Sequence, residues 1–398
     1  MAGNTAVIVV GGGYAGVTAA NRLTRRDDVA VTLINPRPTF VERIRLHQLA
    51  TGSDDAVVDY REVLSERVRL RVDTVTRIDA AGRSLTLAGG DTVGYDYLVY
   101  AVGSGSAEVT VPGAAEHAYP IAGLEEARRL RSVLDAAPAS APITVVGAGP
   151  TGIETAAELA EQGRPVTLVC GSVLGPYLHP RGRRSAAAQL ATLGVTVLDG
   201  PGARVTAVTR DAVRLDDGRE LPSAVTVWTA GFSVPALAGR SGLSTDALGR
   251  LLTDETLTSV DDERIVAAGD SAAPSGVPFR MSCQAAGPLG MHAAGTILRK
   301  IAGEQPEQVA LGFVGQCISL GRRAGLVQLS GRDDTATRYH VSGRVAAKIK
   351  EFVCWGTVKQ LTVEARRPGA ISVPSWMTDG TREQRLGDAG QAEAGVGR

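Results

Sequence analysis

Two segments of the chain repeat one pattern, in which a short apolar strand leads into a glycine-rich turn and then a helix. The first reads AVIVVGGGYAGVTAANRL, residues 6–23, and the second reads ITVVGAGPTGIETAAELAEQG, residues 143–163. Such turns occur in unrelated folds, but β-branched residues before each turn and an amphipathic helix after it favour nucleotide binding. Both copies fit the spacing G-x-G-x-x-G, with Gly11, Gly13 and Gly16 in the first and Gly147, Gly149 and Gly152 in the second.

Each glycine of this spacing has its own physical task. The first permits a tight turn, the second lets the backbone approach a pyrophosphate, and the third lets the helix pack on the strand. The N-terminus of the helix then offers free N–H groups and a positive dipole to the phosphates. The sequence therefore predicts two dinucleotide sites.

The repeat extends beyond the two helices. A second strand follows each helix, VAVTLIN ending at Asn35 and RPVTLVC ending at Cys170. Alternating strands with turn residues between them then start at Arg71 and at Arg204, and each set predicts a β-meander. Each meander leads to a buried strand, in YDYLVYAVGS and in AVTVWTAGF. The chain thus contains two copies of one α/β design. Two dinucleotides held face to face can exchange a hydride, because each ring then has its own cradle.

Bulk composition narrows the class of protein. The 398 residues are 44% hydrophobic and 21% charged, which is typical of a globular chain of two or three domains. A net charge of zero gives no support to nucleic-acid binding or to attraction by an anionic membrane. Neither a signal peptide nor an apolar run long enough to span a bilayer is expected, so we expect a soluble, cytoplasmic protein.

The cysteines give no sign of a metal or dithiol site. No C-x-x-C occurs, so neither a zinc site nor a redox-active dithiol has local support, and a disulfide reductase is disfavoured. We expect no metal. The four cysteines are Cys170, Cys283, Cys317 and Cys354.

These motifs resemble a known family, the FAD-dependent pyridine nucleotide-disulfide oxidoreductases. Within it the chain is most similar to type II NADH:quinone dehydrogenases and apoptosis-inducing-factor-like oxidoreductases, from Val7 to about Ile301. VIVVGGGYAGVTAA is similar to the start of the FAD site, and VVGAGPTGIETAAELAE to the NAD(P) fingerprint. YDYLVYAVGS resembles the A-T-G segment, with Val102 in place of threonine. RIVAAGDSA resembles the second FAD motif, and SCQAAGPLGMHAAGTI the helix that closes over the flavin ring.

The resemblance implies an α/β fold of two interleaved Rossmann-like (three-layer ββα) dinucleotide-binding domains, with a small α+β C-terminal domain. FAD would be held by residues 1–117 and 241–305, and NADH or NADPH by residues 118–240. The C-terminal domain would span 306–378, and the polar tail 379–398 is expected to be disordered.

The resemblance also implies site residues. Glu154 and Gln284 are expected to be catalytic. The expected FAD contacts are Gly11, Gly13, Tyr14, Ala15, Gly16, Asn35, Arg43, Val75, Ala101, Gly103, Asp270, Gln284 and Ala285. The expected NAD(P)H contacts are Gly147, Gly149, Thr151, Gly152, Cys170, Ser172 and Gly231.

Asp270, Gln284, Arg43 and His47 each keep an alternative. Asp270 could accept hydrogen bonds from ribityl hydroxyls at the end of a buried strand, or cap a following helix. Gln284 could lie beside the flavin ring, where the start of helix 284–300 would stabilise negative charge, or be an ordinary first-turn residue. Arg43 could meet the pyrophosphate and His47 could lie near the ring, or both could be solvated surface residues. Asn35 stands where the family usually has an acid, and could bind ribose without charge assistance.

Cys170 replaces the corresponding acid in the second copy. Its loss removes charged hydrogen bonds to NADH and the repulsion of a 2′-phosphate, so we expect NADPH to be a competent donor. Ser172 could bind that phosphate. Nearby arginines could pair with it or form a solvated helix start, namely Arg181, Arg183 and Arg184.

The C-terminal region is predicted to contain two short strands within 313–329 and a helix from about Arg344 to Leu361. The expected apolar face of this helix is Val345, Ile349, Phe352, Val353 and Gly356. A core or dimer-interface helix is favoured over one resting on a membrane, and a membrane-spanning helix is not expected.

The most favoured function is a hydride relay from NAD(P)H through FAD to an acceptor, with a quinone as the leading acceptor. A redox-sensing flavoprotein with slow turnover and a flavoenzyme for a specialised metabolite stay open, as do peripheral membrane contact and a homo-oligomer.

Overall fold

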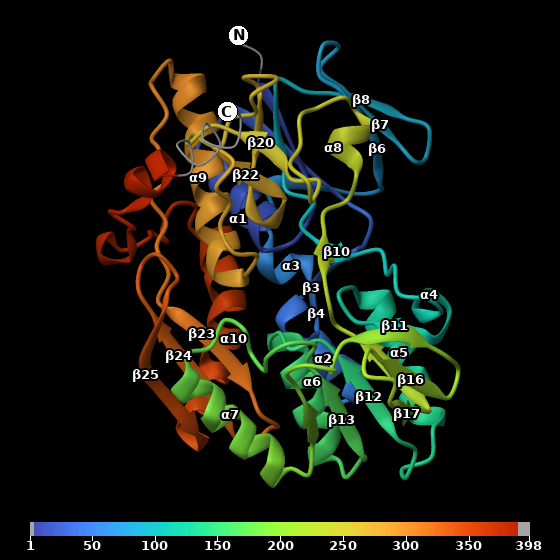
Figure 1. Cartoon of the computed structure of the whole chain (residues 1–398). Helices are drawn as coiled ribbons and strands as arrows, with labels where there is room; N and C mark the ends of the chain where they lie inside the picture. Colours follow the sequence, from blue (N-terminus) through green and yellow to red (C-terminus); the bar gives the residue numbers. More distant parts are fainter. Residues whose placement is uncertain (1–3, 389–398) are drawn as a thin grey trace, which may run out of the picture.

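Two five-stranded parallel sheets form the framework of the computed structural model, which describes residues 4–388 (Figure 1). The first sheet has the order β21-β9-β1-β2-β5 and the second the order β11-β18-β12-β13-β14. The strands of the first are Ile265–Ala267, Tyr97–Tyr100, Thr5–Val10, Val29–Asn35 and Val68–Val72. Those of the second are Ala118–Pro120, Val225–Trp228, Ile143–Val146, Val166–Val169 and Thr196–Leu198.

The two sheets confirm the expected repeat and the α/β fold. β1 and β12 lie at the centre of their sheets, each followed by a helix, α1 (Tyr14–Leu23) or α6 (Pro150–Glu161). Each pairs with the strand after that helix and with the strand after the meander. Strands buried on both faces read as continuous apolar runs, and IVV in β1 and TVV in β12 are fully buried.

Both meanders form as antiparallel three-stranded sheets, and three smaller pairs of strands form as well. The meander strands are β6 (Val75–Asp79), β7 (Ser84–Leu87) and β8 (Thr92–Gly94), then β15 (Val205–Val208), β16 (Ala212–Leu215) and β17 (Glu220–Pro222). The pairs are β3 (Thr39–Val41) with β4 (Val57–Asp59), β10 (Gly105–Ser106) with β19 (Phe232–Ser233), and β20 (Leu251–Thr253) with β22 (Ala272–Pro274).

The remaining helices cover the sheets and join them. The α-helices are α2 (Leu46–Thr51), α3 (Tyr60–Val63), α4 (Ala114–His117), α5 (Leu124–Ala136), α7 (Pro180–Thr192), α8 (Leu237–Arg240) and α9 (Cys283–Ala302). Short 3-10 helices are η1 (Arg43–Arg45), η2 (Gly269–Ser271) and η3 (Ser375–Met377). α9 packs along α1, so the helix expected from about Gln284 to Lys300 forms beside the first glycine turn.

A C-terminal unit of three antiparallel strands and one long helix lies beside both sheets (Figure 1). Its strands are β23 (Gly315–Ser319), β24 (Gly325–Ser330) and β25 (Ala336–Gly343), and its helix is α10 (Arg344–Arg366). The two expected strands form, but β25 was missed. None of its residues is buried, so the sequence lacks the apolar alternation of a half-buried strand.

The prediction of the buried face of α10 is wrong, because the expected apolar face is not the face that the helix buries. Val345 and Phe352 are 60% and 67% exposed, respectively. The helix instead buries the stripe Ala346, Lys350, Cys354, Leu361 and Glu364. Two charged residues in that stripe find buried partners, which a pattern based on hydrophobicity cannot reveal. Among residues 4–388, no helix is both long and apolar enough to cross a bilayer.

The segment expected to be a disordered tail starts with ordered residues. Asp379 and Arg382 are buried, and the Arg382 guanidinium forms an ion pair with Glu255 at 2.6 Å. Arg382 also lies over the Phe279 ring, 4.2 Å from its centroid. The folded chain therefore continues past Asp379, because this arginine has a buried partner. The rest of the tail, residues 389–398, lies outside the described residues.

Candidate functional site

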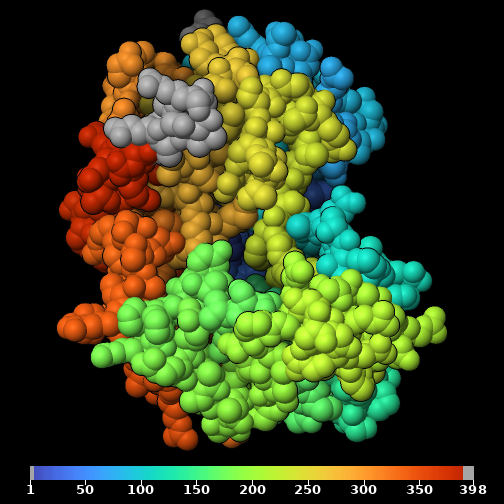
Figure 2. Space-filling model, viewed as in Figure 1, coloured from blue at the N-terminus to red at the C-terminus, as the bar shows by residue number. Residues whose placement is uncertain are grey.

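One cleft of about 1910 Å³ lies between the two parallel sheets and is lined by both glycine turns. Figure 2 shows the molecule hollowed here, between the green segment and the yellow and orange segments above it. A pocket for a single drug-sized ligand usually encloses about 300–1,000 Å³, so this cleft has room for more than one ligand.

The space around each of the six motif glycines matches the task that the dinucleotide motif gives to it. A Cβ on Gly11 would lie 2.1 Å from the Ala101 carbonyl oxygen, and one on Gly147 would lie 2.3 Å from Thr229 Oγ1. Both first glycines have positive φ, +105° and +127°, respectively. The tight turn therefore requires glycine at these two positions.

The second and third glycines complete the match. A Cβ on Gly13 or Gly149 would have no atom within 4 Å, so these positions leave open space. Both line the cleft. A Cβ on Gly16 would lie 1.8 Å from the Gly11 oxygen, and one on Gly152 would lie 2.0 Å from the Gly147 oxygen. Open space at the second glycine is where a pyrophosphate would approach, and the third glycine gives the contact between helix and turn.

The helices after the turns have N-termini suited to anions. Neither α1 nor α6 has a side-chain cap or an acidic residue in its first turn. Apart from Pro150, which has no N–H, the residues of their first turns therefore offer N–H groups to an acceptor from outside the chain, such as a phosphate. Together with the glycine geometry, this fits two dinucleotides.

Asp270 lies at the carboxyl end of β21, where it joins a polar cluster. Its Oδ2 accepts hydrogen bonds from Ser104 Oγ at 2.7 Å and from Arg43 Nη1 at 3.3 Å. The alternative role as a helix cap is wrong, because Asp270 lies inside η2 and Ala268 is its N-cap. Arg43 is not merely a solvated residue, since it pairs with Asp270 inside the cleft.

Asn35 uses its amide to hold the first glycine turn. Its Oδ1 accepts a hydrogen bond from Gly12 N at 2.9 Å, and its Nδ2 donates to Arg37 O at 2.9 Å. Tyr60 also donates to Gly12 O, at 2.8 Å. The amide therefore gives the turn a support that a carboxylate could provide only in part, and a contact between Asn35 and ribose stays a prediction.

Gln284 connects α9 to the start of β23. With its amide oriented to satisfy both neighbours, it donates to Gly315 O and accepts from Val314 N, each at 3.0 Å. Ser282 caps the helix by accepting from Ala285 N. Gln284 lines the cleft. Its placement beside a flavin ring stays a prediction.

The three arginines expected to pair with a 2′-phosphate do not line the cleft. Cys170 and Ser172 line the cleft at the end of β13. Arg181, Arg183 and Arg184 lie on α7, and none of them lines the cleft. The Arg183 guanidinium instead donates to Leu178 O. The structure therefore gives no support to the expected arginine contribution.

A buried ion pair joins the second cradle to the C-terminal unit. Lys350 Nζ lies 2.8 Å from Glu154 Oε1, and both side chains are less than a tenth exposed. Glu154 Oε1 also accepts from Ser319 N at 3.0 Å. Burial alone would raise the pKa of Glu154, but the charge of Lys350 and the hydrogen bonds from Lys350 and Ser319 N act together against it, and the pKa is lowered. Burial likewise opposes the charge of Lys350, yet Glu154 holds its pKa above the ordinary value. Both groups are therefore charged.

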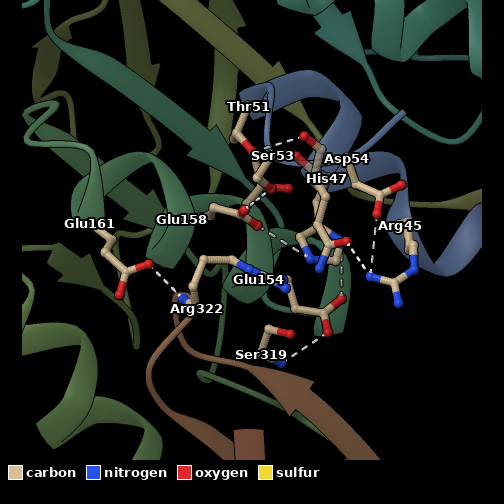
Figure 3. Close-up of polar contacts among 12 residues, drawn as sticks. Arg45, His47, Thr51, Ser53, Asp54, Glu154, Glu158, Glu161, Ser319 and Arg322 are labelled. Carbon is tan, nitrogen blue, oxygen red and sulfur yellow. Dashed lines mark hydrogen bonds and ion pairs between the residues drawn. The ribbon is translucent and has the colours of Figure 1, made fainter. Parts of the chain in front are cut away.

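His47 lies between two carboxylates, as Figure 3 shows. Its Nδ1 is 3.7 Å from Glu154 Oε2 and its Nε2 is 3.5 Å from Glu158 Oε2. The ring is 2% exposed, so its placement as a surface residue is wrong. Burial lowers the pKa of His47 to about 4, because the raising effect of Glu154 does not offset burial and the nearby cations together. Burial raises the pKa of Glu158.

The lowered pKa of His47 predicts a specific loss of stability in acid. An unfolded histidine takes up a proton near pH 6.5, and the folded ring does so only near pH 4. The free energy of unfolding should therefore fall as the pH drops from 6.5 to 4, by about 3 kcal/mol from this residue. Urea unfolding of wild type and His47→Gln at pH 7 and pH 4 measures the difference. An equal pH dependence in both proteins would contradict it.

The sequence located most of the cleft but missed its polar centre. All expected site residues line the cleft except Gly16, Gly152 and Ala285. Lys350 and Ser319 were missed, and His47 was assigned only by resemblance. The one sequence signal for the burial of Lys350 is its spacing of four residues from both Ala346 and Cys354. This spacing can be interpreted only when the buried face of α10 is known.

Comparisons with known proteins agree with this geometry. The model of the family described as pyridine nucleotide-disulphide oxidoreductase matches residues 5–294. The chain is 31% identical to the NADH dehydrogenase-like protein MT1860 of Mycobacterium tuberculosis, over 75% of this chain and 81% of that protein. It is 30% identical to the type II NADH:quinone oxidoreductase Ndh of M. tuberculosis, over 76% of this chain and 74% of that one.

Solved structures show the same fold at lower identity. The sulfide:quinone oxidoreductase of Aquifex aeolicus aligns with a TM-score of 0.78 at 20% identity, covering 92% of this chain and 93% of that one. NDH2 of Plasmodium falciparum in complex with NADH aligns with a TM-score of 0.75 at 15% identity, covering 93% and 99%.

Proposed function

Because the chain belongs to the pyridine nucleotide-disulphide oxidoreductase family, we propose that it oxidises NADH or NADPH and reduces a quinone, with FAD as its bound carrier. The observation that carries the proposal is that both glycine turns line one cleft. Two dinucleotides seated there share one space, so their reactive rings can meet.

Named side chains would hold the cofactors. In the first cradle, the open space at Gly13 and the start of α1 would receive a pyrophosphate, and the cluster of Asp270, Ser104 and Arg43 would bind polar groups of FAD. In the second, Gly149 and the start of α6 would do the same for the nicotinamide nucleotide. When bound, the flavin would supply a carrier that accepts a hydride and releases its electrons to a second acceptor.

A quinone is favoured as the acceptor because it needs no protein thiol. Cys283 and Cys317 line the cleft, but burial raises the pKa of both thiols. Reactive cysteines usually have a lowered pKa, so these two are poorly suited to attack a disulfide or to bind sulfide covalently. The relative Ndh is named for NADH and quinone, which supports this pair of substrates.

Anaerobic stopped-flow measurement tests the function in two halves. NADH should bleach the flavin absorbance rapidly, and a short-chain quinone added afterwards should restore it at a comparable rate. Rapid bleaching with negligible recovery would contradict the quinone assignment and favour a redox sensor. Sodium sulfide in place of NADH is the control for the donor, and it should bleach the flavin far more slowly.

The two nicotinamide donors should be used with similar efficiency. Cys170 cannot offer the charge-assisted hydrogen bonds that favour NADH, and no arginine on α7 lines the cleft to favour NADPH. With neither charge present, we expect kcat/KM for NADH and NADPH to agree within about tenfold, or ~1.4 kcal/mol. A preference of about a hundredfold in either direction would show that other contacts select the donor.

A further inference from the structure

A short segment after α10, residues 371–378, borders the cleft, and we call it the strap (red in Figure 1). At its start, Ile371 O accepts a hydrogen bond from Arg22 Nη2 of α1, and Ile371 N donates to Glu364 Oε2 of α10 at 3.2 Å. The strap is therefore held on two helices where it begins. Most of its residues line the cleft, namely Ile371, Ser372, Val373, Pro374 and Met377.

The far end of the strap is held near the segment that leads to α9. Gly312 N donates to Met377 O at 2.7 Å. Just beyond the strap, Arg382 forms its buried ion pair with Glu255 at 2.6 Å and also donates to Val277 O at 3.2 Å. The strap thus spans from α10 to the segment before α9, and it closes the cleft along this line.

The middle of the strap has few attachments. Among the described residues, no hydrogen bond joins the backbone of residues 372–376 to another segment. Trp376 is 60% exposed, and the Arg332 guanidinium lies over its ring, 5.1 Å from the centroid. The position of the strap therefore depends on its two ends, and release of the far end would lift it as a local opening.

The part of the cleft beside the strap is mostly apolar and contains an unpaired hydroxyl. α9 and α10 both pack on α1, and the three helices line the cleft through Met291, Leu361 and Tyr14, respectively. The Tyr14 hydroxyl is buried and has no hydrogen-bond partner among the described residues, since Thr357 faces it without reaching hydrogen-bond geometry. Burial raises the pKa of this hydroxyl, so it keeps its proton. Such a groove suits a flat ring that carries a carbonyl oxygen, as a quinone does.

We propose that the strap is the lid of the acceptor site and selects quinones by the length of their side chain. This inference rests on the proposed function. A quinone with a short side chain fits beside the closed strap and reaches the bound flavin. A long apolar chain needs the space that the strap occupies, so such a quinone reaches the flavin only while the far end of the strap is released.

Two quinones with the same ring separate chain length from redox chemistry. One is a ubiquinone with a short isoprenoid chain, and the other is decylubiquinone, which has a long alkyl chain. Each is mixed with reduced, flavin-loaded protein in the stopped-flow instrument. The short-chain ubiquinone should restore the flavin absorbance of wild type at least about tenfold faster, because minor open states are populated at roughly 10% or less.

The opening variant is Glu255→Gln with Arg382→Met, which removes both charges of the far anchor and leaves no buried charge unpaired. Reoxidation by decylubiquinone should rise about tenfold, because the open state becomes the main one, and reoxidation by the short-chain ubiquinone should stay the same. Arg299→Met with Glu304→Gln is the matched control, since it removes an ion pair at the end of α9 that does not line the cleft. It should behave like wild type. An equal rise with both quinones, or no rise with decylubiquinone, would overturn the lid.

A cross-link tests the lid in the closing direction. Leu311 and Thr378 are partners in an antiparallel bridge at the far end of the strap, so cysteines at both positions lie within reach of a disulfide. Oxidised Leu311→Cys with Thr378→Cys should react with decylubiquinone at least about tenfold more slowly than its reduced form, and with the short-chain ubiquinone equally fast. A disulfide that forms without slowing decylubiquinone would contradict the proposal.

Cleavage by chymotrypsin gives a readout without turnover. Trp376 is exposed within the strap, and a protease needs the surrounding segment to open locally. Release of the fragment that begins at Met377 should be faster in the opening variant than in wild type, and equal cleavage would overturn the lid. A wild type that ferricyanide reoxidises and neither quinone does would instead overturn the proposed function, and the selection of quinones with it.

Discussion

Lys350→Met should lower the free energy of unfolding by about 3–5 kcal/mol, because it leaves the buried carboxylate of Glu154 without its cation. Methionine keeps most of the volume of lysine, so the loss reports charge rather than packing. Urea unfolding of the flavin-loaded protein at pH 7 measures it. The pKa of Glu154 should rise in this variant, so the loss should become smaller in acid, where the carboxyl group can take up a proton.

A double variant separates the ion pair from its surroundings. Glu154→Gln combined with Lys350→Met removes both charges, and it should regain most of the stability lost by Lys350→Met alone. Lys348→Met, on an exposed position of α10, is the matched control and should change stability by less than about 0.5 kcal/mol. A loss in the double variant as large as in the single one would show that Lys350 acts through packing.

Gly149→Val should weaken the binding of NADH, and so slow reduction at ordinary donor concentrations, while the protein keeps its flavin. The position has extended backbone and open space around it, so valine fits the fold but occupies the space where a pyrophosphate would approach. Overpacking of about 1–3 kcal/mol corresponds to a roughly fivefold to hundredfold weaker donor affinity. The apparent Kd for NADH, from the donor dependence of flavin bleaching, measures it.

Gly13→Val is the reciprocal variant, because it has the same open surroundings in the first copy. It should yield folded protein with little bound flavin, as judged by absorbance and circular dichroism, and should leave NADH binding intact in calorimetry. The pair assigns one nucleotide to each turn. Loss of flavin from Gly149→Val, or its full retention in Gly13→Val, would contradict that assignment.

The repeated part of the fold could be predicted because its signals are local. Gly11 and Gly147 adopt positive φ, and a Cβ at either position would collide with backbone or side-chain atoms. Each position therefore requires glycine by itself, and the sequence shows this requirement directly. The apolar runs before them are buried on both faces of parallel sheets, which produces continuous hydrophobicity rather than alternation. The fold class follows from such patterns without knowledge of distant contacts.

The polar centre could not be predicted because its partners are far apart in the chain. Lys350 and Glu154 are separated by 196 positions, and neither residue type alone indicates burial. Without its partner, a lysine within a helix looks like a solvated residue, so the pattern assigned Phe352 to the buried face instead. Asn35 was read as a weak substitute for an acid, whereas its amide both accepts and donates within the turn. Such pairings appear only when the elements are placed in space.

The buried charges of α10 also determine how the cleft can open. This helix is tied to α1 of the first sheet through Glu364 and Arg22 at 2.8 Å, and to α6 of the second through Lys350 and Glu154 at 2.8 Å. A hinge motion that swung the two sheets apart would have to break one of these pairs, at a cost of several kcal/mol. The helix therefore holds the two sheets at a fixed separation through one ion pair on each side. We expect nucleotides and acceptor to enter and leave a cleft of fixed width with small loop movements, and not by a hinge motion of the two domains.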